Sequence, residues 1–164
     1  MPETLDIQKF ARDMLTFGKR AAENFARKNE EFIPTFLFLN GEEVSAVPIP
    51  YYTHDRDFHI AMLKGLLDAK QADAFCFIME AWISMPPPGT KYDPKVPPSK
   101  DPNRKEGIVI HTAHRDGREV MLMCEIKRHG HKLKFEEPID MSDDGMGKGM
   151  MAIMSNMFGT EKVN

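Results

Sequence analysis

The 164-residue chain is poor in the residues that build several common kinds of site. It has two cysteines, Cys76 and Cys124, and each lies in an apolar run without a CxxC partner or a zinc-like spacing. No apolar run approaches the roughly 18–20 residues that span a bilayer, and the charged start of the chain lacks the apolar core of a secretion signal. These absences exclude a disulfide scaffold and a zinc ribbon, and they predict a cytoplasmic protein with no membrane partner.

Sequence motifs for nucleophilic and phosphate chemistry are also missing. The chain has no Gly-x-Ser-x-Gly element, and both cysteines are typical of core residues. The segment at residues 145–149 is rich in glycine and contains Lys148, but it lacks the spacing of a phosphate-binding loop and indicates a hinge instead. The sequence therefore predicts no cofactor and favours a protein that is not an enzyme.

Two stretches have the three- and four-residue apolar spacing of amphipathic helices, residues 5–28 and residues 55–71. We expect Thr4 to cap the first helix and Asp55 or Thr53 to cap the second. The first helix is expected to bury a stripe made of Ile7, Phe10, Met14, Phe17, Ala21 and Phe25. The second is expected to bury Phe58, Met62, Leu66 and Ala69, with Leu63 and Leu67 beside them.

The remaining apolar runs predict strands. Asn40-Gly41 separates two extended runs and is a strong hairpin signal, since a type I′ turn needs positive φ at both central residues. The second run holds Pro48 and Pro50, which cannot donate ladder hydrogen bonds, so we expect an edge strand there. Residues 74–82 are apolar on both faces and indicate a central strand. From residue 107 onward, three strands with turns at 115–117 and 129–130 form a meander.

Together these elements predict one α+β domain over residues 1–141 in the order α-β-β-α-β-loop-β-β-β. Its sheet is expected to be largely antiparallel, with about six strands and both helices on one face. The loop at residues 85–105 contains seven of the twelve prolines, which makes it stiff and extended. Residues 142–164 are expected to form a flexible tail rich in glycine and methionine, with the spacing of a short C-terminal helix near its end.

Part of the chain resembles a group of small uncharacterised proteins from bacterial and phage genomes. In that group, a strand ending in Ala-Trp, here Ala81-Trp82, precedes a Pro-Ser-x-x-Pro-x-Arg-x-Glu segment, here residues 98–106. The resemblance covers roughly residues 74–126, about a third of the chain. The group has no assigned activity, so the resemblance implies only a bacterial or phage-encoded accessory protein and no catalytic residue.

The most enzyme-like pattern is Glu125-Ile126-Lys127 at the end of an apolar strand, after a turn that contains Asp116. Restriction-type nucleases use a Glu-x-Lys on a strand, where the Glu and an upstream Asp bind a divalent metal. Here Asp116 lies in the turn rather than on the strand. The same pattern is common in exposed strands, where it forms an ion pair on one face.

Weaker candidates come from the histidines and from one acidic residue. His129 and His131 flank Gly130, and a turn could bring them together, but the sequence predicts no metal site overall. Glu80 lies in the apolar run 74–82, where a buried carboxyl must be paired or have a raised pKa. The simpler interpretation places Glu80 at a strand end, reaching solvent or a neighbouring Arg or Lys.

The leading hypothesis is a non-enzymatic accessory or regulatory protein that binds another protein. Its surface would be the sheet edge, the proline-rich loop or the methionine-rich tail, because thioethers adapt to irregular partner grooves. The candidate partner-binding residues are Met150, Met154, Met157, Phe158 and Arg104. The alternative is a metal-dependent nuclease or nucleic-acid-binding protein that uses residues 100–134, whose net charge is +4. Two further hypotheses are that the protein binds a small ligand in a cleft between the sheet and the helices, and that it self-associates into a homo-oligomer.

Overall fold

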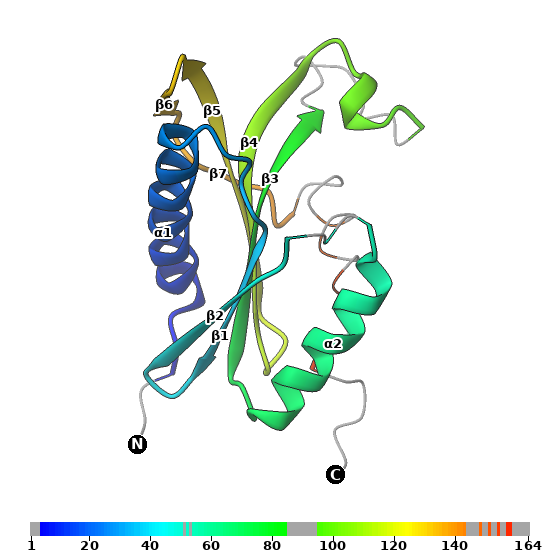
Figure 1. Ribbon diagram of the computed structural model, residues 1–164. Helices are drawn as coiled ribbons and strands as arrows, with labels where there is room; N and C mark the ends of the chain where they lie inside the picture. The colour runs from blue at the N-terminus through cyan, green and yellow to red at the C-terminus, as the bar shows by residue number, and fades with distance from the viewer. Residues whose placement is uncertain are drawn as a thin grey trace.

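The structure, a computed structural model, is an antiparallel sheet with one helix on each face (Figure 1). It describes residues 4–50, 52, 54–84, 95–143, 148, 151, 154, 157 and 158. The elements in chain order are α1 (Ile7–Arg27), β1 (Thr35–Asn40), β2 (Glu43–Pro48), α2 (Arg56–Ala69), β3 (Ala74–Ser84), the 3₁₀ turn η1 (Pro98–Lys100), β4 (Arg104–His114), β5 (Glu119–His129), β6 (Lys132–Phe135) and β7 (Ile139–Asp140). No helix in these ranges is long and apolar enough to cross a membrane.

The sheet confirms the α+β class with two helices, and it has seven strands where about six were expected. Its order is β2-β1-β3-β4-β5-β6, with the short β7 paired to β5. The predicted hairpin forms, but its turn differs from the expected one: Asn40 pairs with Glu43, so the two central residues are Gly41 and Glu42. Of these, only Gly41 has a positive φ, 62°, so the turn is not the expected type I′. β2 lies at the edge and β3 lies between β1 and β4, both as expected from the sequence.

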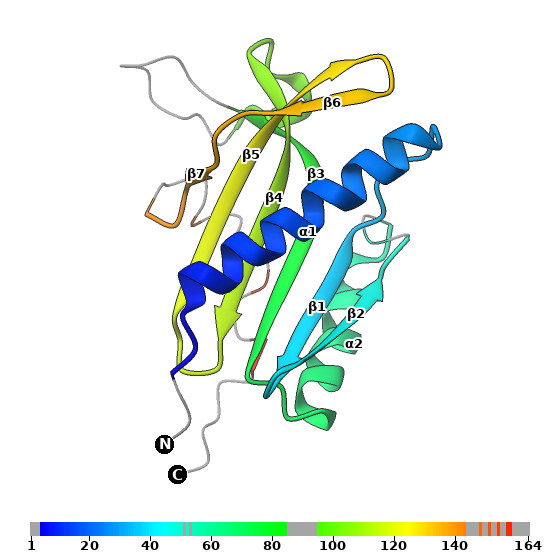
Figure 2. The same cartoon turned by 90° about the vertical axis from the view of Figure 1, so that its left-hand side faces the viewer.

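The expectation that both helices share one face is wrong. In Figure 1, α1 lies to the left of the sheet and α2 to the right, and Figure 2 shows α1 running diagonally across its own face. Alternate residues of β3 explain the arrangement, because Cys76 and Ile78 belong to the cluster under α1 whereas Phe75 and Phe77 belong to the cluster under α2. Both faces of the central strands are apolar, so each face needs its own helix.

Helix α1 begins two residues later than expected, and it buries a different stripe. Asp6, not Thr4, is the N-cap, and its carboxylate accepts a hydrogen bond of 3.1 Å from the backbone N–H of Lys9. The predicted stripe is wrong at Phe17, which is 42% exposed. The buried residues of α1 are mostly small: Ile7, Phe10, Ala11, Leu15, Gly18, Ala22 and Ala26. Small side chains let the helix backbone approach the sheet closely. The helix packs through these residues, and not every aromatic residue of α1 is buried as a result.

Helix α2 also turns a different side to the sheet. Leu63 and Leu67 are buried, whereas Phe58 is 67% exposed, Met62 is 39% exposed and Ala69 is also exposed, so the predicted stripe is wrong at these three positions. The helix carries apolar residues on several sides. Its spacing alone therefore does not identify the side that packs.

The methionine-rich tail is described at only a few positions. Met154 and Met157 are buried in the cluster under α2, and Met151 is buried beside Met121 and Met123. This packing uses their side chains within the chain, so they are not presented to a partner in this arrangement. Met150 and the hinge at residues 145–147 lie outside the described residues, and so does most of the expected C-terminal helix.

Candidate functional site

The residues of the nuclease pattern are not brought together. The strand register places Glu125 opposite Gly107, six residues along β5 from the Ala113–Glu119 pair beside the turn that holds Asp116. At about 3.4 Å per residue, the separation is roughly 20 Å. Glu125 faces Lys105 (Oε2 to Nζ, 3.4 Å), and Lys127 faces Glu136 (Nζ to Oε1, 3.1 Å). Each candidate therefore has its own ion-pair partner.

The two histidines of the β5–β6 hairpin have different surroundings. His131 Nδ1 lies 3.2 Å from the carbonyl oxygen of Ala26 at the end of α1, whereas His129 pairs with Lys132 in the β5–β6 hairpin. Within the part of the chain that the structure describes, no group of three or more His, Cys, Asp or Glu side chains could hold a metal ion.

Glu80 is the candidate whose side chain contacts other charged side chains. Its carboxylate forms an ion pair with Arg128, and the same guanidinium donates to both oxygens of Glu106, with 2.9 Å from Nε to each of them. The three residues come from β3, β4 and β5, which are neighbours in the sheet. The structure thus pairs Glu80 with a neighbouring arginine and adds a second carboxyl group beside it, but β3 continues to Ser84, so the expectation that Glu80 lies at a strand end is wrong.

Two carboxyl groups around one guanidinium have different proton affinities. Burial and then the hydrogen bond with Glu106 raise the pKa of Glu80 to about 7, although the charge of Arg128 opposes the shift. Burial alone would raise the pKa of Glu106 too. Hydrogen bonds from Arg128 and Glu80 outweigh that effect and lower it. The pKa of Glu80 is thus the raised one of the pair, and the two carboxyls together gain their second negative charge near neutral pH.

These residues lie in a concave surface of about 650 Å³ at the C-terminal end of α1, which we call the acidic cleft. Its lining residues are Ala26, Asn29, Glu30, Glu31, Phe32, Glu80, Ala81, Trp82, Glu106, Arg128, Gly130 and His131. Four of these side chains carry carboxyl groups, and only one is a permanent cation. The cleft is therefore a local acidic site.

The backbone conformation at the end of α1 positions some of the residues that line the acidic cleft. Asn29 has a φ of 55°, and the backbone N–H groups of Asn29 and Glu30 donate to the carbonyls of Ala26 and Phe25, at 3.1 and 2.9 Å. This is the Schellman arrangement that ends a helix and turns the chain. The edge-to-face contact of Phe32 with Phe25, at 5.6 Å between ring centroids, then holds the turned segment along the cleft.

Trp82 forms one wall of the acidic cleft and is 48% exposed. The guanidinium carbon of Arg104 lies 4.6 Å from the centre of the indole ring, a cation–π contact. Nη1 of Arg104 also donates to the carbonyl of Ser99, at 3.0 Å, which ties the end of the proline-rich loop to this wall. The predicted partner-binding residue Arg104 therefore lies beside the cleft.

Sequence reasoning missed Glu106 and Arg128 as parts of this site. The signal that could have found them is the meander, because the turn between β4 and β5 determines their register, in which Gly107 lies opposite Glu125. Trp82 pairs with Glu106 across β3 and β4, and Glu80 lies two residues before Trp82 on the same side of the strand.

No protein-family model, curated protein or solved structure significantly matches this chain.

Proposed function

We propose that this protein is a non-enzymatic accessory protein that binds a basic segment of a partner protein in the acidic cleft. The observation that carries the proposal is the half-exposed indole of Trp82 beside four carboxyl groups in one concave surface. An indole offers its ring face to a cation, and carboxylates orient the guanidinium or ammonium group of a partner. Tryptophan is also among the residues that most often carry binding energy at interfaces.

Contacts inside the chain support this chemistry. Arg104 stacks on Trp82, and Arg128 bridges Glu80 and Glu106, so both kinds of contact with an arginine already exist in the site. A partner arginine would extend the same pattern. Because Glu80 has a raised pKa, the cleft gains charge as the pH rises through about 7, and binding of a cation should tighten over that range.

The alternative of a nuclease or nucleic-acid-binding protein receives less support from this geometry. Many cations in residues 100–134 face carboxylates: Lys105 faces Glu125, Lys127 faces Glu136, and Arg118 faces Asp116. Such pairing lowers the positive potential that would attract a phosphate backbone.

The fluorescence of Trp82, the only tryptophan in the chain, provides the test. We expect a peptide with four arginines to change the emission saturably, and the change to weaken with added salt, because the contacts are electrostatic. A matched peptide with four glutamates should have no effect. Equal responses to the two peptides would refute the proposal.

Substitutions in the cleft make the test specific. Glu106→Gln should weaken binding of the arginine peptide about fivefold, the effect of one partly exposed charge pair. Glu42→Gln, in the exposed β1–β2 turn, is the control and should leave binding unchanged. If both variants behave alike, the acidic cleft is not the binding site.

A further inference from the structure

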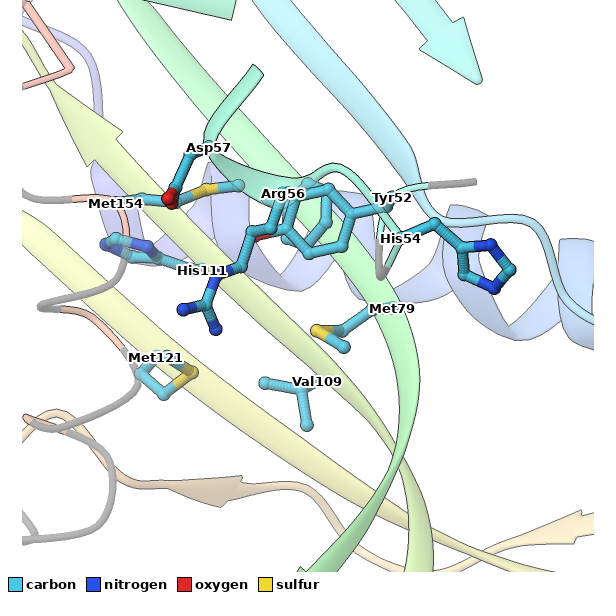
Figure 3. A pocket seen from close by; sticks show the side chains of 10 residues that line it. Tyr52, His54, Arg56, Asp57, Met79, Val109, His111, Met121 and Met154 are labelled. Atoms are coloured by element: carbon cyan, nitrogen blue, oxygen red, sulfur yellow. The ribbon is translucent and has the colours of Figure 1, made fainter. Parts of the chain in front are cut away.

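A hollow of about 400 Å³ lies where the start of α2 stands over β3, β4 and β5 (Figure 3). This volume is in the usual range of small-molecule sites, roughly 300–1,000 Å³. The hollow is separate from the acidic cleft, because Phe77 and Met79 line it whereas Glu80 and Trp82 line the cleft. Alternate residues of β3 thus serve opposite faces of the sheet.

The floor of the hollow is apolar. Met79, Val109 and Met121 come from three adjacent strands, and Phe77 and Met154 complete the wall. Thioethers are polarizable and adapt to the shape of an apolar group, so this floor suits a branched or aromatic body of moderate size. Figure 3 shows Met79, Val109 and Met121 grouped below Arg56 and Asp57, with Met154 beside Asp57.

His111 adds a polar group to the wall of the hollow. Packing of the apolar wall does not require this group. The strand register places it between Phe77 and Met121, and its side chain is only 4% exposed. Its Nε2 atom has no hydrogen-bond partner among the described residues, and the nearest carboxylate oxygen, Oε2 of Glu119, is 3.5 Å away. A buried polar atom in that state is typical of a place where a ligand or a water completes the hydrogen bonding.

The rim carries two opposite charges next to each other. Arg56 and Asp57 lie in the first turn of α2, are exposed, and form no ion pair with any described residue. The N-cap residue Asp55 makes no side-chain capping hydrogen bond, so the helix N-terminus keeps its positive end toward this rim. Figure 3 shows both side chains at the hollow, with the guanidinium of Arg56 over it.

We propose that this hollow binds an apolar α-amino acid. The carboxylate of the ligand pairs with Arg56, its ammonium group pairs with Asp57, and its side chain lies on the floor formed by Met79, Val109 and Met121. A simple carboxylic acid would leave Asp57 facing a like charge, and a simple amine would do the same at Arg56. A zwitterionic head group is the one that matches both residues.

Isothermal titration calorimetry on the full chain tests this proposal with L-phenylalanine, L-leucine and L-methionine as probes. The comparison compounds are 3-phenylpropanoate, phenethylamine and glycine, which lack the ammonium group, the carboxylate and the apolar body respectively. We expect at least one apolar amino acid to bind about tenfold more tightly than its comparison compounds, as two charge contacts and one apolar contact require. Absence of binding by all three probes, or equal binding by 3-phenylpropanoate, overturns the proposal.

Two exposed substitutions distinguish the roles of the rim charges. Arg56→Gln should weaken amino-acid binding about tenfold, whereas Asp57→Asn should weaken it and at the same time strengthen binding of 3-phenylpropanoate. Asp68→Asn and Lys70→Gln, exposed at the far end of α2, are the controls and should change neither affinity. If the rim variants match these controls, the assignment is wrong. Such a failure would not contradict the proposal for the acidic cleft, because binding there is measured separately by Trp82 fluorescence.

Discussion

The two faces of the sheet are covered by helices that approach it differently. On one face, a Cβ added to Gly18 of α1 would lie 3.1 Å from Cγ2 of Ile78, which shows how close the helix backbone comes. On the other face, α2 packs through the larger side chains of Leu63 and Leu67 onto the cluster that holds the buried rings of Phe36 and Phe75, and its backbone makes no comparably close approach to any described strand. Side-chain size at the interface thus sets how closely a helix packs.

Removal of a buried ring on the α2 face should have the largest effect. Phe36 is fully buried and stacks on Phe75 at 5.2 Å between centroids, so Phe36→Ala should lower the free energy of unfolding by about 3–5 kcal/mol. Phe58→Ala, at a mostly exposed position of α2, should change it by less than about 0.5 kcal/mol. Urea unfolding measures both. A large loss for Phe58→Ala would show that α2 packs through the stripe expected from the sequence.

A pair of glycine substitutions tests the close approach of α1 to the sheet, with the exposed Gly65 of α2 as the control position. Gly18→Leu forces a side chain between α1 and Ile78 and should destabilise the fold by about 1–3 kcal/mol. Gly65→Leu enters open space and removes a helix-interior glycine, so it should be neutral or stabilising by up to about 1 kcal/mol. Thermal or urea unfolding gives both values. Similar losses at the two positions would contradict the close approach of α1.

The smallest effect concerns the proton on Glu80, on the α1 face. Its pKa of about 7 in the folded protein lies above its usual 4.5, so the folded state holds a proton that the unfolded chain releases. The free energy of unfolding should therefore fall as the pH rises from about 4.5 to 7, by about 1–2 kcal/mol because the carboxyl is partly solvated.

Glu80→Gln mimics the protonated carboxyl and should remove this pH dependence. Urea unfolding at several pH values measures it, with Glu42→Gln as a control that should follow the unsubstituted protein. A variant Glu80→Gln that keeps the full pH dependence would show that another group is responsible.

Much of the sheet could be predicted because its signals are local. The turn at Asn40-Gly41, the prolines of β2 and the doubly apolar run of β3 each restrict backbone geometry or burial within a few residues. The candidate site could be predicted only in part. Glu80 was recognisable as a carboxyl in an apolar strand that needs a partner, whereas Arg128, the partner it has, lies 48 residues away in the chain.

Local sequence patterns were sufficient for the two helices, the first six strands and the antiparallel class, but not for β7, since alternation, turn residues and prolines act over short distances. Only the tertiary structure decided which side of each helix is buried, that the helices take opposite faces, and that Glu80, Glu106 and Arg128 meet. The physical reason is that both helices are apolar on more than one side, so local periodicity leaves several orientations of similar energy. Close packing of the whole core selects one of them, and the sites on the two faces follow from that choice.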